Sequence, residues 1–432
     1  MSLLSRGIGK QANSLSTNHE PEIKYSGMSN TLKPWVTMAR ERIFSLAAGN
    51  RAGKIAPRIM ELGMAKVLYA ANELGADIEK SKPFGFFAPD GTITYNKDRI
   101  SRGFSYGGAL NLDFDGLMGT SNSMPNGCGF SIYELVDPMS DELMMEYLRT
   151  AQDRLGKDQI SQLGKGNHFA GVYTPLDPVT GEDTNRRFVV VHCSGHVDGE
   201  KLYFPETWLT EEDGYHLIET PHGPITLLEG EARKRYVEQF KFTDKANAKN
   251  RDITMDEIFE TNPWRRLEEI THQGLIENGS THIIGTQKHD GMMPIAFNPE
   301  EGLVAVKTKP NLTSEFMDYW PEGERIKMLG YDKMFNQLNL TPHGGGYEFK
   351  HPLKSLDIQL SSQGISKFTI EFTNVPGKTE FSFFREIRHH MTYRRRAPIM
   401  REVDRADLAE IVYEMPSLMQ IYPIVSIPGG SH

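Results

Sequence analysis

Apolar residues recur every three or four positions along several stretches of the chain, as they do on one face of an α-helix. The longest such stretch runs from Trp35 to Glu79, and the polar pair Gly49-Asn50 divides it, so two helices are predicted there. Ser140 is suited to cap a helix that continues to about Arg154, because its hydroxyl can accept a hydrogen bond from the first turn. The same period predicts further helices over residues 231–260, Pro263–Glu277 and Arg405–Tyr413.

Short apolar runs bounded by turn residues predict β-strands between these helices. Phe188–His192 contains three consecutive valines, which is typical of a buried strand. Residues Pro83–Asn111 consist of short apolar pieces separated by turns, which favours strands and hairpins. Further strands are predicted over His282–Thr286, Leu303–Lys307, Phe368–Phe372 and Ile421–Ile427. Because helices and strands are intermixed without a regular βαβ alternation, the predicted fold class is α+β.

The first 30 residues differ from the rest of the chain. They are polar and show no clear period, so a loosely ordered N-terminal arm is expected over residues 1–30. Arg6 and Lys10 are not followed by an apolar core, which argues against a secretory signal. No run approaches the roughly 18 apolar residues of a membrane helix. With only Cys128 and Cys193, no disulfide framework is expected, and we predict a cytoplasmic protein without a membrane partner.

The acidic balance of the chain limits the partners that can be expected. A formal net charge of −9 argues against a surface broadly adapted to nucleic acid, but it is compatible with a local basic groove. Short basic clusters could contact phosphates, although a solvated surface is the commoner role of such runs. These clusters are Arg186-Arg187, Arg233-Lys234-Arg235 and Arg394-Arg395-Arg396.

One cysteine and three histidines stand in settings that suit metal ligands. Cys128 follows a tight turn, His168 lies in a glycine-rich loop, and His192 ends the valine-rich strand. His272 is expected on the predicted helix Pro263–Glu277. Thiolate and imidazole together suit Mn, Fe, Co or Zn, whereas Mg and Ca prefer carboxylates. Because no two of these residues are close in sequence, a buried structural role remains the alternative for each.

His343 stands apart because Gly344, Gly345 and Gly346 follow it directly. Glycine-rich turns can expose backbone N–H groups that bind anions. An imidazole that faces a bound phosphate can act as a nucleophile and form a phosphoramidate. The alternative is a histidine in a flexible surface loop.

The order of these motifs resembles that of the RtcB-type RNA-splicing ligases. The resemblance extends over about Met124–Gly429, and Gly-Asn-His-Phe and His-Gly-Gly-Gly are its most specific parts. In chain order, the matching segments are Cys128-Gly129, Leu163-Gly164-Lys165-Gly166-Asn167-His168-Phe169, the strand ending in His192, Ala246-Asn247-Ala248-Lys249-Asn250-Arg251, His272, His343-Gly344-Gly345-Gly346, Val403-Asp404 and Tyr422-Pro423-Ile424-Val425.

The resemblance implies an α+β fold with mixed sheets around a central metal cleft. The catalytic domain would cover residues 31–432, with a divergent N-terminal part over 31–120. The implied reaction joins an RNA 3′-phosphate, or a 2′,3′-cyclic phosphate, to a 5′-hydroxyl, with two Mn²⁺ ions and GTP as cofactors. GTP would first guanylylate a histidine. A helper protein for turnover is a further possible partner.

The resemblance also implies a role for each matching residue. Cys128, His168, His192 and His272 would hold the metal ions, and His343 would be the nucleophile. The residues implied to contact the nucleotide or its phosphates, or to line the cleft, are Asn167, Asn250, Arg251, Gly344 and Gly345.

Several positions depart from the family pattern. Pro125 replaces a metal-binding Asp, for which Asp113 or Asp115 are candidate substitutes, and the Gly-Ser-Met-Gly phosphate loop expected near residues 300–312 is missing. Gly171 replaces the acidic residue that reads guanine. Tyr347 and Pro428 likewise replace an Arg and a Lys. A nucleotide other than GTP therefore remains open. Two alternatives also remain: a metal-dependent phosphoesterase on the same scaffold, and a non-catalytic RNA-binding protein.

Overall fold

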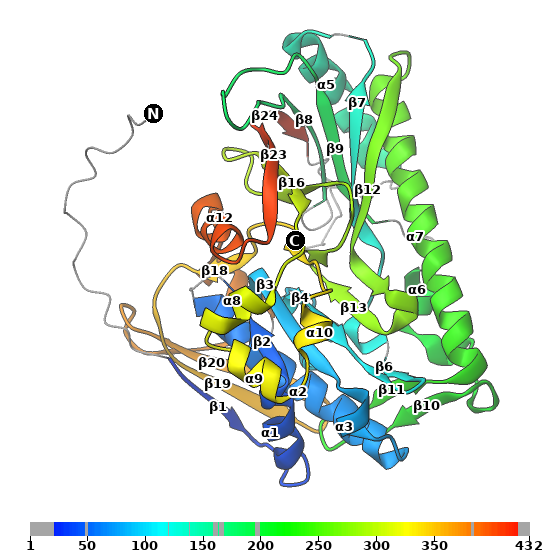
Figure 1. The fold of residues 1–432 in the computed structure, drawn as a ribbon, viewed down its shortest axis with the longest axis vertical. Helices are drawn as coiled ribbons and strands as arrows, with labels where there is room; N and C mark the ends of the chain where they lie inside the picture. The colour runs from blue at the N-terminus through cyan, green and yellow to red at the C-terminus, as the bar shows by residue number, and fades with distance from the viewer. Residues whose placement is uncertain are drawn as a thin grey trace.

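A nine-stranded mixed sheet runs through the molecule (Figure 1). The computed structural model describes residues 21–47, 51–119, 121–137, 139–158, 163, 168–194, 199–381 and 384–421. Neighbouring strands of this sheet are antiparallel, except for the parallel pair β2 and β3. In spatial order the strands are β2 (Ile43–Ser45), β3 (Phe84–Thr92), β4 (Tyr106–Asn111), β13 (Thr281–Ile284), β12 (Trp264–Ile276), β7 (Cys128–Leu135), β9 (Phe188–Cys193), β8 (Phe169–Tyr173) and β24 (Ser417–Ile421).

Strand β9 shows how the core is divided by this sheet. Successive side chains of a strand point to opposite faces. Val190 belongs to one apolar cluster together with Phe130 of β7. Val189 and Val191 belong to another cluster, which includes Ile258. The valine run is thus buried on both faces, as the sequence pattern indicates.

Helices pack against the strands of the large sheet. The longest, α7 (Gly230–Phe259), packs along β7, β9 and β12, as Figure 1 shows in green. The other helices are α1 (Lys33–Glu41), α2 (Arg51–Glu73), α3 (Ile78–Ser81), α4 (Lys97–Ser101), α5 (Asp141–Asp158), α6 (Gly199–Tyr203), α8 (Ser314–Tyr319), α9 (Gly323–Met328), α10 (Asp332–Phe335), α11 (Phe384–Ile387) and α12 (Arg396–Arg405).

Smaller sheets surround the large one. One contains β1 (Glu22–Ser26), β19 (Leu353–Ser361), β20 (Gly364–Phe372) and β21 (Lys378–Phe381). A second contains β10 (Tyr215–Ile218), β11 (Ile225–Leu228), β6 (Leu117–Gly119) and β5 (Asp113–Phe114). The remaining sheets join β15 (Met292–Ala296), β16 (Leu303–Thr308) and β23 (Ala409–Met415); β14 (Thr286–Gln287) and β17 (Thr341–Pro342); and β18 (Tyr347–Phe349) and β22 (Met391–Tyr393).

The α+β class and several predicted elements are confirmed. Strand β9, helix α7, strand β16 and strand β20 occur where the apolar pattern predicts them. The Ser140 hydroxyl accepts a hydrogen bond from the backbone N–H of Leu143 at 3.3 Å, so the predicted cap of α5 is also present. Strands β3 and β4 fall within residues 83–111, with the short helix α4 between them.

The predicted helix Pro263–Glu277 is wrong, because this segment is strand β12. It lies between β7 and β13 and forms ladder hydrogen bonds with both. The register of β12 against β7 shifts at two places. Each shift interrupts the alternation of polar and apolar residues, so the two-residue period of a strand is hard to see in the sequence. Pairing with two neighbours thus overrides the weak helical pattern.

The predicted helix Arg405–Tyr413 is also wrong. Helix α12 ends at Arg405, and residues from Ala409 onward form β23, which pairs with β16. Asp407 between them has a backbone φ of 46°. This left-handed conformation cannot continue a right-handed helix, so the chain turns there and enters the sheet.

The N-terminal expectations are confirmed only in part. Residues 1–20 lie outside the described residues, but Glu22–Ser26 form β1, paired in parallel with β19, and are not a loose arm. The two helices expected between Trp35 and Glu79 correspond to α1 and α2, with β2 between them. Gly49-Asn50 and residues 422–427 lie outside the described residues.

Within the described part of the chain, no helix combines the length and the apolar character needed to span a membrane.

Candidate metal centre and its neighbouring histidine

Four side chains far apart in sequence converge at one end of strands β7, β8, β9 and β12. Cys128 opens β7, His168 directly precedes β8, and His192 lies near the end of β9. The ladder pairs Phe130 and Phe169 with His192, and Cys128 with Gln273, the neighbour of His272 in β12. Because these strands are adjacent, the register itself gathers the four side chains.

The distances between the ligand atoms are short. Cys128 Sγ lies 3.3 Å from His168 Nε2 and 3.4 Å from His192 Nε2. His192 Nε2 lies 3.2 Å from His272 Nε2. Cys128, His192 and His272 each place one ligand atom within 4.8 Å of the other two. All four residues are buried, so the structure brings together the complete set that the resemblance implies as metal ligands.

The electrostatics of the cluster suit a transition metal ion. Burial raises the pKa of the Cys128 thiol to about 12, so without a metal the thiol keeps its proton. Burial, and then the neighbouring His343 and His192, lower the pKa of His272 well below its usual range. A neutral imidazole keeps a lone pair for a metal, and a bound ion would displace the thiol proton. The group holds one thiol and two imidazoles and no described carboxylate, and a third imidazole, that of His168, contacts its thiol. Such a donor set fits Zn, Fe, Co or Mn.

His343 lies beside the cluster and is fixed by a buried carboxylate. Its ring centre is 4.8 Å from that of His272. His343 Nδ1 lies 2.6 Å from Asp90 Oδ2, and the backbone N–H of His343 donates to the same oxygen at 3.1 Å. Asp90 is 0% exposed. With Nδ1–H donating to the carboxylate, Nε2 carries the lone pair of the imidazole.

The sequence pattern did not single out Asp90, which lies in the turn-rich stretch Pro83–Asn111. The structure places it in β3, where every position is buried. A single acidic residue after the apolar run Phe86-Phe87-Ala88 was the available signal, because a buried carboxylate needs a partner.

The predicted anion nest after His343 is not found at Gly344 and Gly345. The N–H of Gly344 donates to Asp90 at 3.4 Å, and that of Gly345 donates to the carbonyl of Ala296 at 3.1 Å and the hydroxyl of Tyr393 at 3.0 Å. A Cβ on Gly344 would lie 2.6 Å from that hydroxyl. These glycines therefore allow close packing, and their N–H groups are already engaged.

The residues of helix α7 support the cluster from behind. Arg251 is fully buried and donates to Ser131 Oγ at 2.9 Å and to the carbonyl of Cys193 at 2.7 Å, and it also pairs with Glu269. Its neighbour Asn250 is also buried. The contacts of Arg251 thus join β7, β9 and β12, rather than leaving its guanidinium available to a nucleotide. Asn167 lies outside the described residues.

A second residue of α7 holds the turn that presents the cysteine. Asn247 Nδ2 donates to the carbonyl of Asn126 at 2.8 Å and to that of Gly127 at 3.0 Å. Asn126 Oδ1 in turn accepts from the backbone N–H of Cys128 at 3.0 Å. The position of the thiol is therefore set by the Ala-x-Ala-x-Asn-Arg segment through side-chain hydrogen bonds.

The acidic residues considered as substitutes at Pro125 are engaged elsewhere. Asp113 accepts from the Arg233 guanidinium at 2.6 Å, and Asp115 pairs with Lys80 at 2.5 Å on the surface. Neither belongs to the metal-binding group. A second ion would thus lack these carboxylates as ligands.

Two cavities meet at His343. One, of about 200 Å³, is lined by His192, Phe130 and Ala296 as well as by His343. The other, of about 290 Å³, is lined by Cys128 and His168 together with His343. His343, although buried, thus belongs to the walls of both cavities, and members of the metal-binding group line each of them.

Comparison with known proteins identifies no relative of the chain. No family model matches the sequence, and neither does any curated protein. The chemistry of the chain must be inferred from the residues that converge on His343.

Proposed function

We propose that the protein is a metal-dependent RNA ligase of the RtcB type. It would join an RNA 3′-phosphate or 2′,3′-cyclic phosphate to a 5′-hydroxyl through a nucleotidylated His343. The observation that carries this proposal is the Asp90–His343 pair, set beside the buried cluster of Cys128, His168, His192 and His272.

The first step would use the free nitrogen of His343. Its Nε2 lone pair attacks the α-phosphorus of a nucleoside triphosphate, an N–P bond forms, and the bond to the β-phosphate oxygen breaks to release diphosphate. Asp90 accepts the Nδ1 hydrogen bond and stabilises the positive charge that develops on the ring. The Nδ1 proton stays between the two residues throughout.

The metal site would serve the same phosphates. Cys128, His168, His192 and His272 are the residues that would hold an ion. A bound ion would supply positive charge that stabilises the phosphate during attack by the nucleophile. The resemblance alone suggests that the ion is Mn²⁺, that two ions bind, and that the nucleotide is GTP.

The two cavities support a reaction with two substrates. In the second step, an oxygen of the RNA 3′-phosphate attacks the phosphoramidate, and the N–P bond breaks to free His343. The 5′-hydroxyl of the second strand then attacks the RNA phosphorus and expels the nucleoside monophosphate. Because His343 lines both cavities, a nucleotide and an RNA end could be placed on the two sides of a phosphorus atom bound at its Nε2.

A phosphoesterase remains the second candidate, and one observation favours it. Gly171 lies inside β8, paired with Val190 and Gln420, and a Cβ there would lie 2.6 Å from the Tyr173 hydroxyl. The position has neither an acidic side chain nor room for one. A protein that does not read guanine but holds a metal ion could instead hydrolyse a cyclic phosphate or a phosphodiester without a nucleotide.

Joining of defined RNA ends tests the proposal. RNAs ending in a 3′-phosphate and a 5′-hydroxyl would be incubated with Mn²⁺ and either GTP or ATP. We expect a joined product with the wild type and none with His343→Ala. The matched control is His216→Ala, because His216 pairs with Glu229 outside the cluster. Equal joining by His343→Ala would overturn the proposal, and hydrolysis without a nucleotide would support the phosphoesterase.

A further inference from the structure

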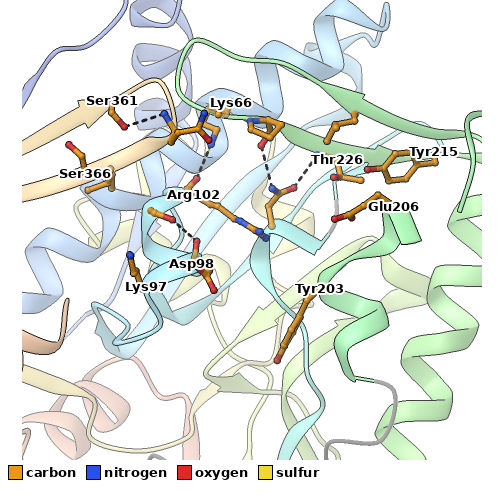
Figure 2. Close-up of a pocket in the computed structure, with 17 residues that line it drawn as sticks. Lys66, Lys97, Asp98, Arg102, Tyr203, Glu206, Tyr215, Thr226, Ser361 and Ser366 are labelled. Atoms are coloured by element: carbon orange, nitrogen blue, oxygen red, sulfur yellow. Dashed lines mark hydrogen bonds between the residues drawn. The ribbon is translucent and has the colours of Figure 1, made fainter. Parts of the chain in front are cut away.

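A larger cavity is lined by Lys97, Asp98 and Ser101 of helix α4, whereas Arg99 of the same helix lines the smaller cavity beside Cys128. The volume of this larger cavity is about 700 Å³, within the range of sites that hold a nucleotide-sized ligand. Its walls come from α2, from the region of α4, and from the turn between β19 and β20, as the close-up in Figure 2 shows. No residue of the metal-binding group lines it.

Lys66 is the unusual side chain of this cavity. It is only 1% exposed, although lysine is among the residues least often buried. Within the described chain, its Nζ lies 3.4 Å from the carbonyl oxygen of Arg102 and forms no ion pair with a carboxylate. Burial, and then the nearby Arg102, lower the pKa of Lys66 to about 7, while Glu219 opposes them. An anion in the cavity would compensate this buried amine.

Arg102 provides a second cation at the same place. Figure 2 shows its side chain extending into the cavity, below Lys66. Within the described chain its guanidinium pairs with no carboxylate. Asp98 and Glu206 also line the cavity, so the wall is mixed in charge, but Lys97 adds a third cation. The part between Lys66 and Arg102 is the part suited to a phosphate.

Tyrosine side chains complete the wall and connect the cavity with the metal centre. The rings of Tyr203 and Tyr215 line it, and aromatic rings are the usual platforms for unpaired bases. Tyr203 also lies close to the side chain of Asn126, which itself lines the smaller cavity next to Cys128. Tyr203 and Asn126 therefore connect the wall of the large cavity with that of the candidate reaction site.

We propose that this cavity binds single-stranded RNA just behind the end that reacts at His343. Lys66 and Arg102 would neutralise a backbone phosphate, and Tyr203 would stack on a base. The identification of the ligand as RNA rests on the proposed function. The paired cations and the volume of the cavity support a phosphate-bearing ligand independently.

RNA affinity in an Arg102→Gln variant tests this inference. Fluorescence anisotropy with a ten-nucleotide single-stranded RNA carrying a 3′-phosphate would be recorded over a series of salt concentrations. We expect binding to weaken about 5- to 20-fold and the salt dependence to fall by about one released counterion. Arg405→Gln is the matched control, because Arg405 pairs with Glu402 on the exposed helix α12. Lys66→Met provides a second variant with the same expected loss.

The outcomes separate RNA from a free anion. Unchanged RNA affinity in both Arg102→Gln and Lys66→Met would overturn the inference. It would also be overturned if inorganic phosphate or a mononucleotide bound in an Arg102-dependent way while RNA did not, because the cavity would then be a small-anion site. Labelling of His343 by nucleotide requires no RNA, so it should stay at the wild-type level in Arg102→Gln. Loss of labelling in the wild type would instead refute the proposed function.

Discussion

At the scale of single residues, Asp90 decides which nitrogen of His343 keeps its lone pair. One carboxylate oxygen accepts hydrogen bonds from Nδ1, from the backbone N–H of His343 and from that of Gly344. An asparagine has nearly the same shape and can still accept through its oxygen, but it carries no charge.

We therefore expect Asp90→Asn to fold normally and to slow RNA joining by about 10- to 100-fold, as loss of an orienting partner typically does. Single-turnover rates measured beside thermal melting curves would check this. Asp357→Asn is the control, because Asp357 lies outside the candidate site and accepts a hydrogen bond from Ser26. Joining at an unchanged rate would mean that Asp90 has only a structural role.

Lys66 gives a prediction about stability with a definite pH dependence. An unfolded lysine holds its proton up to about pH 10.4, whereas the buried Lys66 loses it at about pH 7. Between these values the unfolded chain binds more protons, so this residue makes stability rise with pH. Arg102 lowers the pKa of Lys66 further and Glu219 opposes it, so both contribute to the size of the effect.

Lys66→Met should consequently raise the free energy of unfolding at pH 7 by about 1–3 kcal/mol. It should also remove part of the rise in stability between pH 7 and 9. Urea unfolding at several pH values measures both quantities. A variant less stable than the wild type at pH 7 would show that the amine is well compensated in the folded protein.

At the scale of secondary-structure elements, the contacts of Arg251 join helix α7 to three strands. Its guanidinium binds Ser131 of β7, the carbonyl of Cys193 in β9, and Glu269 of β12. These are the strands that position three of the four cluster residues. Arg251 is the buried partner of the salt bridge to Glu269. Removal of its guanidinium would leave the Glu269 carboxylate without this buried partner.

Arg251→Met is expected to destabilise the protein by about 3–5 kcal/mol and to reduce metal content through loss of the strand register. Chemical denaturation and metal analysis of the purified variant would test this. Arg266→Met serves as the comparison, because Arg266 pairs with Asp252 and Glu269 nearer the surface. Similar losses from both variants would contradict a special role for the buried guanidinium.

The elements also show which predictions the sequence could support. Strand β9 can be recognised from local sequence because burial on both faces gives a continuous apolar run, Val189–Val191. Helix α7 can be recognised because a helix of its length repeats its apolar period many times. Segment 264–276 does not, since its strand form depends on β7 and β13, which lie far away in the chain. The turn at Asp407 likewise has no sequence signal as strong as a glycine.

Some residues of the candidate site could likewise be predicted from the sequence, and others could not. Cys128 and the three histidines were found from the motif order, and the sheet register explains why they meet. Asp90 lies more than 250 positions before His343, so only the fold brings the two together. The Lys66 cavity was missed because its residues come from α2, α4 and distant turns.

At the scale of the whole molecule, a metal ion would bridge segments from residue 128 to residue 272. Such an ion binds the folded protein and not the unfolded chain. A free concentration of 100 times its Kd would therefore stabilise the fold by about 2.7 kcal/mol.

Treatment with a chelator should thus lower the melting temperature of the wild type by several degrees, and added Mn²⁺ or Zn²⁺ should restore it. The Cys128→Ala variant should show no such response, because it lacks the thiol that contacts both His168 and His192. Cys193→Ala, at a buried cysteine outside the group, controls for the loss of a thiol. An equal response in Cys128→Ala would place the metal elsewhere.

Covalent attachment of a nucleotide to His343 is the most direct test of the central claim. The wild type, His343→Ala and Asp90→Asn would be incubated with Mn²⁺ and α-labelled GTP or ATP and separated on denaturing gels. We predict a labelled band in the wild type, no band in His343→Ala and a weak band in Asp90→Asn. An unlabelled wild type that contains metal, or an equally labelled His343→Ala, would contradict the account.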